Sequence, residues 1–308
     1  MTIVEVGPRD GFQSIQPLIP TDAKIALIEK LHGAGVRRME ATAFVSQTAV
    51  PQLADAAAVF AGARALDGLD VQVLVPNRRY AERAIEAGAR HLAYVLSASE
   101  RHNLSNVRRS CKESVEDYAR IVEALPEGAA MRLNLATVFD CPFVGQIAVE
   151  ASLALLDVLL PLLPEAEICA CDTTGRATPD RVAGLFEAAR ARFPQVRRWA
   201  YHGHDTYGLG VANAIAAMQA EVDVIDASFA GLGGCPFAPG ATGNVATEDL
   251  VWTLGQMGID CGIDLDRLIE VSREAAALAG ARPGGRVRTA ISARLGLATV
   301  LDTPETFG

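Results

Sequence analysis

Short runs of aliphatic and β-branched residues alternate with longer amphipathic segments along roughly the first 260 residues of the chain. Strands show a hydrophobic period of two and helices one of 3.6, so this alternation predicts repeated strand–helix units and a parallel sheet. Eight strands are expected, and they are Thr2–Val6, Val36–Ala41, Val71–Val75, His91–Ser97, Met131–Val138, Glu167–Asp172, Arg198–His204 and Val222–Phe229.

Eight parallel strands in an α/β chain of this length predict a closed (β/α)8 barrel, the TIM-barrel fold. No linker rich in Pro, Gly or Ser interrupts the alternation, so residues 1–308 are expected to form a single domain. The barrel would end near residue 260, and residues 261–308 would form a C-terminal helical extension with a helix from Asp264 to Ala279. Helices between the strands are expected near residues 21–34, 50–63, 78–88, 112–125, 147–162, 178–193, 208–220 and 247–257.

Composition narrows the choice of partners. Half of the 308 residues are hydrophobic and the formal net charge is −9, which argues against nucleic-acid binding because phosphates need a basic surface. No apolar run reaches the roughly 18 residues of a membrane-spanning helix, and the opening residues are typical of a strand rather than a targeting leader. We therefore expect a cytoplasmic protein that acts on small molecules and has no membrane partner.

Polar residues gather where the predicted strands end, which is where TIM barrels place their catalytic groups. His202 and His204 lie two apart in one strand, so both side chains project to the same side and could share a metal ion. Asp10, after the first strand, is the natural third ligand. The competing interpretations are two hydrogen-bonded histidines at the rim and an aspartate that caps a turn.

Asn244 ends a glycine-rich loop over residues 231–244 that could fold over such a site. Its amide oxygen would complete a mixed nitrogen and oxygen ligand set of the kind that suits Mg²⁺ or Mn²⁺. Cys235 lies in the same loop rather than in a strand, which favours a chemical role over that of a buried packing thiol.

Three further charged residues end predicted strands or follow them. Arg9 could stabilise a developing oxyanion at the mouth of the barrel, although a simple ion pair with Asp10 is the alternative. Glu40 could hold Arg9 in place, and Asp172, which also ends a strand, could have a similar supporting role. A solvated loop carboxylate is the alternative for both acids.

With these motifs in place, the chain resembles the hydroxymethylglutaryl-CoA lyase family, within the wider group of TIM-barrel metallolyases and acyl-CoA condensing enzymes, over nearly its whole length. The resemblance rests on the motifs Glu5-Val6-Gly7-Pro8-Arg9-Asp10-Gly11, Glu40-Ala41-Thr42 with Phe44-Val45-Ser46, Asp172-Thr173, His202-Gly203-His204-Asp205-Thr206-Tyr207-Gly208, Gly233-Gly234-Cys235-Pro236, Gly243-Asn244 and Ala246-Thr247-Glu248-Asp249-Leu250.

The resemblance implies a retro-Claisen cleavage of an acyl-CoA. The C3 hydroxyl is deprotonated, the C2–C3 bond breaks, and acetyl-CoA leaves as an enolate that is then protonated. It implies metal ligation by Asp10, His202, His204 and Asn244, enolate stabilisation by Arg9 and acid or base chemistry by Cys235. Glu40, Asp10 and His202 are also expected among the catalytic residues, and the residues expected to bind the acyl-CoA are Gln13, Arg132 and Asp172.

Two positions near the expected acyl pocket depart from the family pattern. Relatives often continue after Gln13 with Asn, Glu and Lys, where this chain has Ser14-Ile15-Gln16. The fifth strand tends to carry an aromatic hydroxyl where this chain, aligned on Arg132, has Asn134. Citramalyl-CoA is therefore an alternative substrate.

Two other functions compete with the lyase. A condensing enzyme like isopropylmalate or homocitrate synthase would share the metal and the barrel, but those enzymes resemble His-x-His-Asn-Asp after the seventh strand, where Asp205 and Thr206 follow His204 here. A non-catalytic barrel that binds metal or acyl-CoA is the second alternative. A homodimer or higher homo-oligomer is expected by analogy with other extended barrels.

Overall fold

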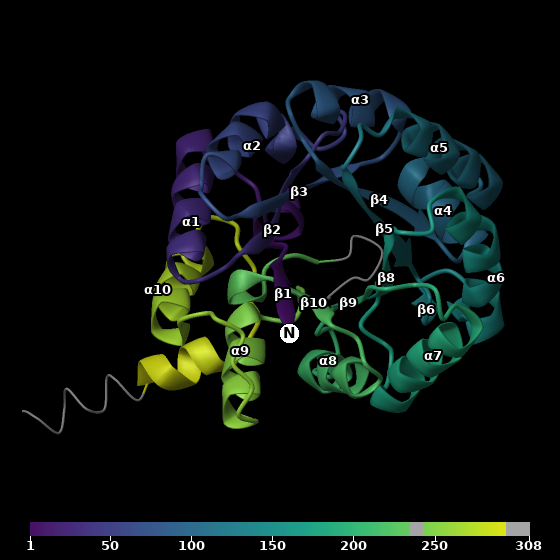
Figure 1. Cartoon of the computed structure of the whole chain (residues 1–308). Coiled ribbons are helices and arrows are strands. Elements are labelled where there is room, and N and C mark those ends of the chain that lie inside the picture. Colours follow the sequence, from purple (N-terminus) through teal and green to yellow (C-terminus); the bar gives the residue numbers. More distant parts are fainter. Residues whose placement is uncertain (235–242, 294–308) are drawn as a thin grey trace, which may run out of the picture.

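Eight parallel strands form a closed barrel at the centre of the protein, and helices surround it (Figure 1). The computed structural model describes residues 1–234 and 243–293. The barrel strands are β1 Thr2–Glu5, β2 Arg38–Ala43, β3 Asp70–Val75, β4 His91–Ser97, β5 Ala130–Ala136, β8 Glu167–Asp172, β9 Trp199–Gly203 and β10 Val224–Ala227. Their order around the barrel is β1-β10-β9-β8-β5-β4-β3-β2, which confirms the predicted TIM barrel.

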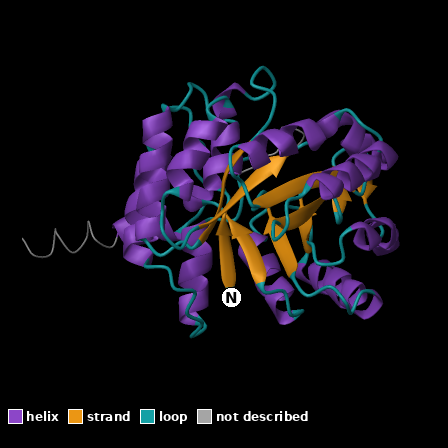
Figure 2. Ribbon diagram, turned by 45° about the horizontal axis from the view of Figure 1, so that its top comes forward, coloured by secondary structure: helices purple, strands orange, loops and turns teal. Residues whose placement is uncertain are grey.

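The helices form an outer layer around the strands (Figure 2). They bury one face each, as α7 does with Val182, Leu185, Phe186 and Ala189 at the spacing of successive helical turns. Within the described ranges, no helix has the length and apolar character to cross a membrane. The bounds are α1 Thr21–Gly33, α2 Ala56–Arg64, α3 Arg78–Glu86, α4 Glu100–Val107, α5 Cys111–Ala124, α6 Val149–Leu159, α7 Pro179–Arg192, α8 Gly210–Gln219, α9 Thr247–Gln256 and α10 Leu265–Ala276.

The structure differs from the predicted elements mainly after β4. Two helices, α4 and α5, follow this strand, where one helix near residues 112–125 was expected. Arg108 adopts a left-handed conformation with φ of 56° and ends α4, and Ser110 starts α5 with a capping box to Glu113. The polar sequence of α4 hides its helical period, so hydrophobic patterning alone detects only the second helix.

Smaller differences occur elsewhere. The helix expected over residues 50–63 is a 3-10 turn at Pro51–Leu53 followed by α2. A short hairpin, β6 Asp140–Cys141 paired with β7 Gly145–Gln146, precedes α6. The strand expected to include His204 ends at Gly203, and the backbone of His204 instead forms an isolated bridge with Asn244.

The described part of the C-terminal extension, residues 261–293, packs on the barrel of its own chain. The helix α10 lies against α1, and the Asp264 N–H donates to the Ala34 carbonyl at 2.7 Å. Gly35 has φ of 106°, and a Cβ there would lie 2.2 Å from the Gly262 carbonyl oxygen, so this contact requires glycine. Further along, Arg288 donates to the buried Glu248 of α9 at 2.9 Å.

Ion pairs cross the interior of the barrel, which in most TIM barrels is filled by branched apolar side chains. Arg38 of β2 donates to both carboxylate oxygens of Glu167 of β8, each at 2.7 Å, although these strands are not neighbours. Arg132 of β5 likewise reaches Asp226 of β10 at 2.7 Å. All four residues are buried, so each charge depends on its partner.

We predict that Arg38→Met lowers the free energy of unfolding by about 3–5 kcal/mol, because the buried Glu167 would lose both hydrogen bonds from Arg38 and keep only the more distant Arg132, at 3.4 Å, as a counter-charge. Arg78→Met is the matched control, since Arg78 pairs with Glu82 at 2.8 Å with both side chains nearly half exposed. The control should leave stability nearly unchanged, because solvent screens an exposed ion pair. Urea unfolding followed by circular dichroism measures both, and equal effects would contradict the prediction.

Candidate metal centre and active site

Asp10 reaches the mouth of the barrel on a wide helical turn. Residues Gly7–Gly11 form a π-helical segment, η1, directly after β1, and the Asp10 N–H donates to the Val6 carbonyl at 2.7 Å. Such π-type turns are rare and occur mostly at functional sites. The turn places the Asp10 carboxylate over the open end of the barrel, facing β9.

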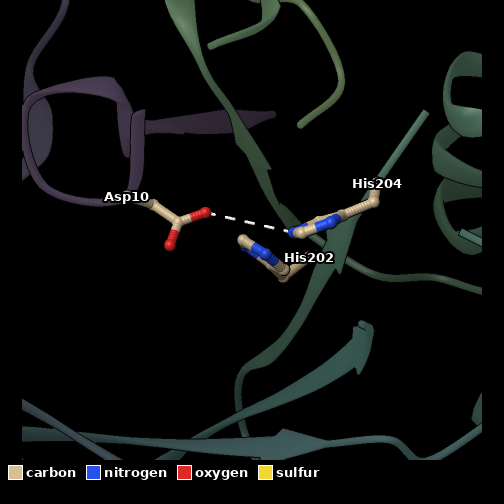
Figure 3. Close-up of side chains that lie close together, drawn as sticks. All are labelled: Asp10, His202 and His204. Atoms are coloured by element: carbon tan, nitrogen blue, oxygen red, sulfur yellow. Dashed lines mark ion pairs between the residues drawn. The ribbon is translucent and has the colours of Figure 1, made fainter. Parts of the chain in front are cut away.

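His202 and His204 face this carboxylate from the end of β9 (Figure 3). One ligand atom from each of Asp10, His202 and His204 can be chosen so that all three lie within 4.8 Å of one another. His204 Nε2 and Asp10 Oδ2 are 4.0 Å apart. The structure therefore brings together the three ligands expected from the sequence in a group that could hold a metal ion.

Asn244 joins this group from the loop after β10. Its Nδ2 donates to Asp10 Oδ2 at 2.8 Å and to the Leu232 carbonyl at 3.0 Å. Its Oδ1 is buried and has no hydrogen-bond partner among the described residues. A buried amide oxygen without a donor, beside a carboxylate and two imidazoles, fits a divalent cation that accepts mixed nitrogen and oxygen ligands.

The charge states of Asp10 and His204 suit metal binding. Burial raises the pKa of Asp10, but the positive charge of Arg9 and the two histidines outweigh it and lower the pKa to about 2. Burial, aided by His202, lowers the pKa of His204 to about 4. Near neutral pH, Asp10 is thus ionised and His204 is neutral, which are the protonation states that metal ligands require.

Arg9 is held in place by two carboxylates. Its Nε donates to Glu40, and its Nη1 donates to Asp10 Oδ1 at 2.6 Å. Glu40 is 1% exposed and also accepts a hydrogen bond from Gln72 at 2.7 Å. Burial alone would lower the pKa of Arg9, but Glu40 and Asp10 raise it, so the guanidinium stays charged. The ion pair with Asp10 therefore exists, and it leaves Arg9 facing the site.

A cavity of about 180 Å³ adjoins the metal-binding group and is lined by Arg9, Asp10, His202 and His204. Gln13 lines it as well. Its remaining wall is part polar and part apolar, and includes Asn134, His102, Leu74 and Val95. A small acyl group with polar substituents would find both kinds of contact here.

Two expected site residues, Arg132 and Asp172, do not line the cavity. Arg132 is fully buried beneath the cavity, where its Nε donates to Asn134 Oδ1 at 2.8 Å. Asp172 accepts the N–H groups of Arg176 and Ala177, both at 3.1 Å, and so shapes the loop after β8. Burial raises the pKa of Asp172 to about 6. Cys235 lies outside the described residues.

Asp226, which sequence reasoning did not single out, takes part in the site, and so does His102 of α4. Asp226 accepts a hydrogen bond from His202 Nδ1 at 3.0 Å. A carboxylate inside the apolar run of a predicted strand is a signal that could have found it, because such a group needs a buried partner. His102 lines the cavity from α4, and Ser97 Oγ lies 2.6 Å from its Nδ1.

The model of the HMGL-like family matches residues 1–274. The chain belongs to this family. The mitochondrial hydroxymethylglutaryl-CoA lyase of Bos taurus is 42% identical over 87% of this chain and 82% of its own length. The hydroxymethylglutaryl-CoA lyase of Pseudomonas mevalonii is 41% identical, with 95% and 97% of the two chains matched. The mitochondrial enzyme of Arabidopsis thaliana is longer: at 39% identity the match spans 95% of this chain but 62% of that protein.

Solved structures agree with this placement of the HMGL-like chain. An HMG-CoA lyase from Acinetobacter baumannii in complex with coenzyme A and 3-methylmalate is 40% identical, with a TM-score of 0.89 and 94% of each chain covered. The carboxyl transferase domain of Rhizobium etli pyruvate carboxylase, at 18% identity and a TM-score of 0.69, shares the fold alone. The predicted hydroxymethylglutaryl-CoA lyase family, and with it the lyase class, is confirmed.

We predict that His102 stays neutral far below the usual range of histidine, because burial lowers its pKa from 6.5 to about 4. Since the folded-state pKa lies below the unfolded value, the neutral ring contributes stability above pH 6.5, and this contribution is lost as the pH falls towards about 4. NMR titration of the histidine ring protons measures the midpoint. A midpoint near 6.5 for His102 would contradict the prediction.

Proposed function

We propose that this HMGL-like protein is a divalent-metal-dependent carbon–carbon lyase. It cleaves 3-hydroxy-3-methylglutaryl-CoA, or a closely related 3-hydroxyacyl-CoA, to acetyl-CoA and a keto acid by retro-Claisen chemistry. The observation that carries the proposal is the approach of Asp10, His202 and His204 ligand atoms to within 4.8 Å at the wall of a cavity that Arg9 also lines. The relatives named hydroxymethylglutaryl-CoA lyase support the choice of substrate.

The proposed metal is Mg²⁺ or Mn²⁺, held by Asp10, His202, His204 and the Oδ1 of Asn244. Oxygen donors make up half of this set, and no thiolate belongs to it, which favours these ions over a structural zinc. When bound, the dication would lower the pKa of the substrate's C3 hydroxyl and orient the acyl group.

Arg9 is the proposed stabiliser of the enolate. Breaking the C2–C3 bond moves negative charge onto the thioester oxygen, and a fixed cation placed there is typically worth about 3–4 kcal/mol of barrier. Glu40 and Asp10 hold the guanidinium through Nε and Nη1, so its Nη2 is left to face the substrate. Arg9 therefore needs little rearrangement when the charge develops.

Cys235 is the proposed acid that protonates the departing enolate, or the base in the reverse direction. Gly234, the described residue that precedes it in the chain, lines the cavity. Delivery of the proton by a loop residue would keep bulk water away from the enolate.

The acyl group is proposed to meet Gln13 and Asn134. Because Arg132 donates to Asn134 Oδ1 at 2.8 Å, the amide turns its two N–H donors away from Arg132, and these are available to a carboxylate or carbonyl oxygen in the cavity. Arg132 thus contributes to acyl binding through Asn134. Asp172 would act through the loop it shapes. Hydroxymethylglutaryl-CoA and citramalyl-CoA both carry a carboxylate that fits these donors.

Three expectations stay predictions from the sequence. They are a single domain over residues 1–308, a homodimer or higher homo-oligomer, and a cytoplasmic location. Light scattering of the purified protein tests the oligomeric state.

Incubation with Mg²⁺ or Mn²⁺ and a panel of 3-hydroxyacyl-CoA thioesters tests the function, with acetyl-CoA detected by mass spectrometry. We expect hydroxymethylglutaryl-CoA to be cleaved fastest, and both EDTA and His204→Ala to abolish release, because each removes the metal. Faster cleavage of citramalyl-CoA would instead assign that substrate. Thiol release from acetyl-CoA and a 2-oxo acid would indicate a condensing enzyme, and inertness in every assay would indicate a binding protein.

Arg9→Gln should lower kcat by about 100- to 1000-fold, since glutamine cannot supply the positive charge at the enolate oxygen. Mn²⁺ binding, measured by electron paramagnetic resonance, should persist because no ligand is removed. Arg176→Gln is the control, because this exposed arginine pairs with Asp140 and Tyr207 on the same side of the barrel. An Arg9→Gln enzyme with normal kcat would rule out the proposed role.

A further inference from the structure

We propose that Asp226 is a positioning residue for His202 and that Arg132 locks Asp226 in place, so that the barrel interior decides which nitrogen of His202 faces the metal. The inference rests on the metal site of the proposed function. It concerns Arg132 and Asp226, which lie inside the barrel beneath that site and do not bind the metal themselves.

The three side chains form a continuous buried chain of contacts. Asp226 of β10 is paired in register with His202 of β9, and Asp226 Oδ2 lies 3.0 Å from His202 Nδ1. On its other side, Asp226 accepts hydrogen bonds from Arg132 Nη2 at 2.8 Å and 2.7 Å. Arg132 is fully buried and Asp226 is 4% exposed, so bulk solvent has little access to these bonds.

The chemistry of these groups dictates the state of His202. An ionised carboxylate can only accept hydrogen bonds, so the Nδ1 of a neutral His202 must carry the proton that the contact requires. The lone pair then lies on Nε2, which is the nitrogen left to bind a cation. Histidine ligands in metal sites are commonly oriented in this way by a second carboxylate, and loss of that partner weakens metal affinity.

Arg132 makes the arrangement stiff. A buried carboxylate needs a nearby positive charge, and Arg132 supplies it through Nη2, which donates to both oxygens of Asp226. The same guanidinium donates through Nε to Asn134 in the wall of the acyl cavity. One buried arginine therefore orients both a proposed metal ligand and a proposed substrate contact.

An asparagine at position 226 could not satisfy both neighbours. Asp226 Oδ2 accepts from Arg132 and from His202 at once, and Oδ1 accepts from Arg132. In Asp226→Asn, one of these oxygens becomes an NH₂ donor. It would face either the donors of Arg132 or the Nδ1 of His202, and the second outcome moves the imidazole proton to Nε2, where it blocks metal binding.

The test is Mn²⁺ binding to the full-length, metal-free protein without acyl-CoA, measured by electron paramagnetic resonance. We expect Asp226→Asn to weaken binding by about 10- to 100-fold, and Asp226→Glu, which restores the anionic acceptor, to recover part of the loss. Asp117→Asn is the matched control. Asp117 is a second buried carboxylate paired with arginines, at 3.3 Å from Arg120, and it lies on α5 away from the site. The control should bind Mn²⁺ as the wild type does.

A folded Asp226→Asn protein that binds Mn²⁺ with wild-type affinity would overturn the proposal. Circular dichroism checks folding, and nitrogen-15 NMR of the histidine rings in the metal-free wild type at alkaline pH supplies a second readout that needs no variant. We expect His202 in the Nδ1–H form, and the Nε2–H form would refute the inference. If Mn²⁺ binding by the wild type and the variants follows the expected pattern but the wild type cleaves no thioester, only the lyase function is overturned.

Discussion

The ion pair between Arg132 and Asp226 spans the barrel interior, and the geometry of the site above it depends on it. Both residues are buried, and each would lose its nearest opposite charge if the other moved. Asp226 contacts His202 and Arg132 contacts Asn134, so the pair links one side of the metal-binding group to the wall of the cavity. A purely apolar barrel layer could pack as densely, but it could not orient an imidazole or an amide.

A second buried chain supports the other side of the site. Glu40 holds Arg9 and accepts a hydrogen bond from Gln72, which in turn accepts one from Arg38 at 3.0 Å. Arg38 is anchored by Glu167, and Glu167 also lies 3.4 Å from Arg132. The two chains therefore meet near the opposite mouth of the barrel. Buried charges are tolerated only when they are paired, so this network favours a single arrangement of its side chains. That arrangement keeps the reactive groups of the site in position.

The barrel by itself says little about the chemistry. The pyruvate carboxylase domain has the same fold at 18% identity, and it is the residues at the mouth of the barrel that distinguish this chain. Here those residues have preset protonation states, with the pKa of Asp10 near 2 and that of His204 near 4. An anionic carboxylate and a neutral imidazole next to a charged Arg9 are suited to a hard cation and to a substrate that becomes negative during the reaction.

The sequence by itself predicted the barrel from local periodicity, and it predicted the candidate metal ligands because the ends of barrel strands meet at one mouth. Hydrophobic periodicity reveals strands and helices, and the two-residue spacing of His202 and His204 places both rings on one side of a strand. Only the tertiary structure decided that Arg132 lies beneath the cavity and that Asp226 orients His202. These two residues are 94 positions apart, and their side chains meet inside the barrel from strands that are not neighbours. The local hydrophobic pattern cannot predict such a contact. Helix α4 was missed for a different reason: its sequence is polar, so hydrophobic periodicity does not reveal it, although the Ser110 and Glu113 capping box that begins α5 is a local signal.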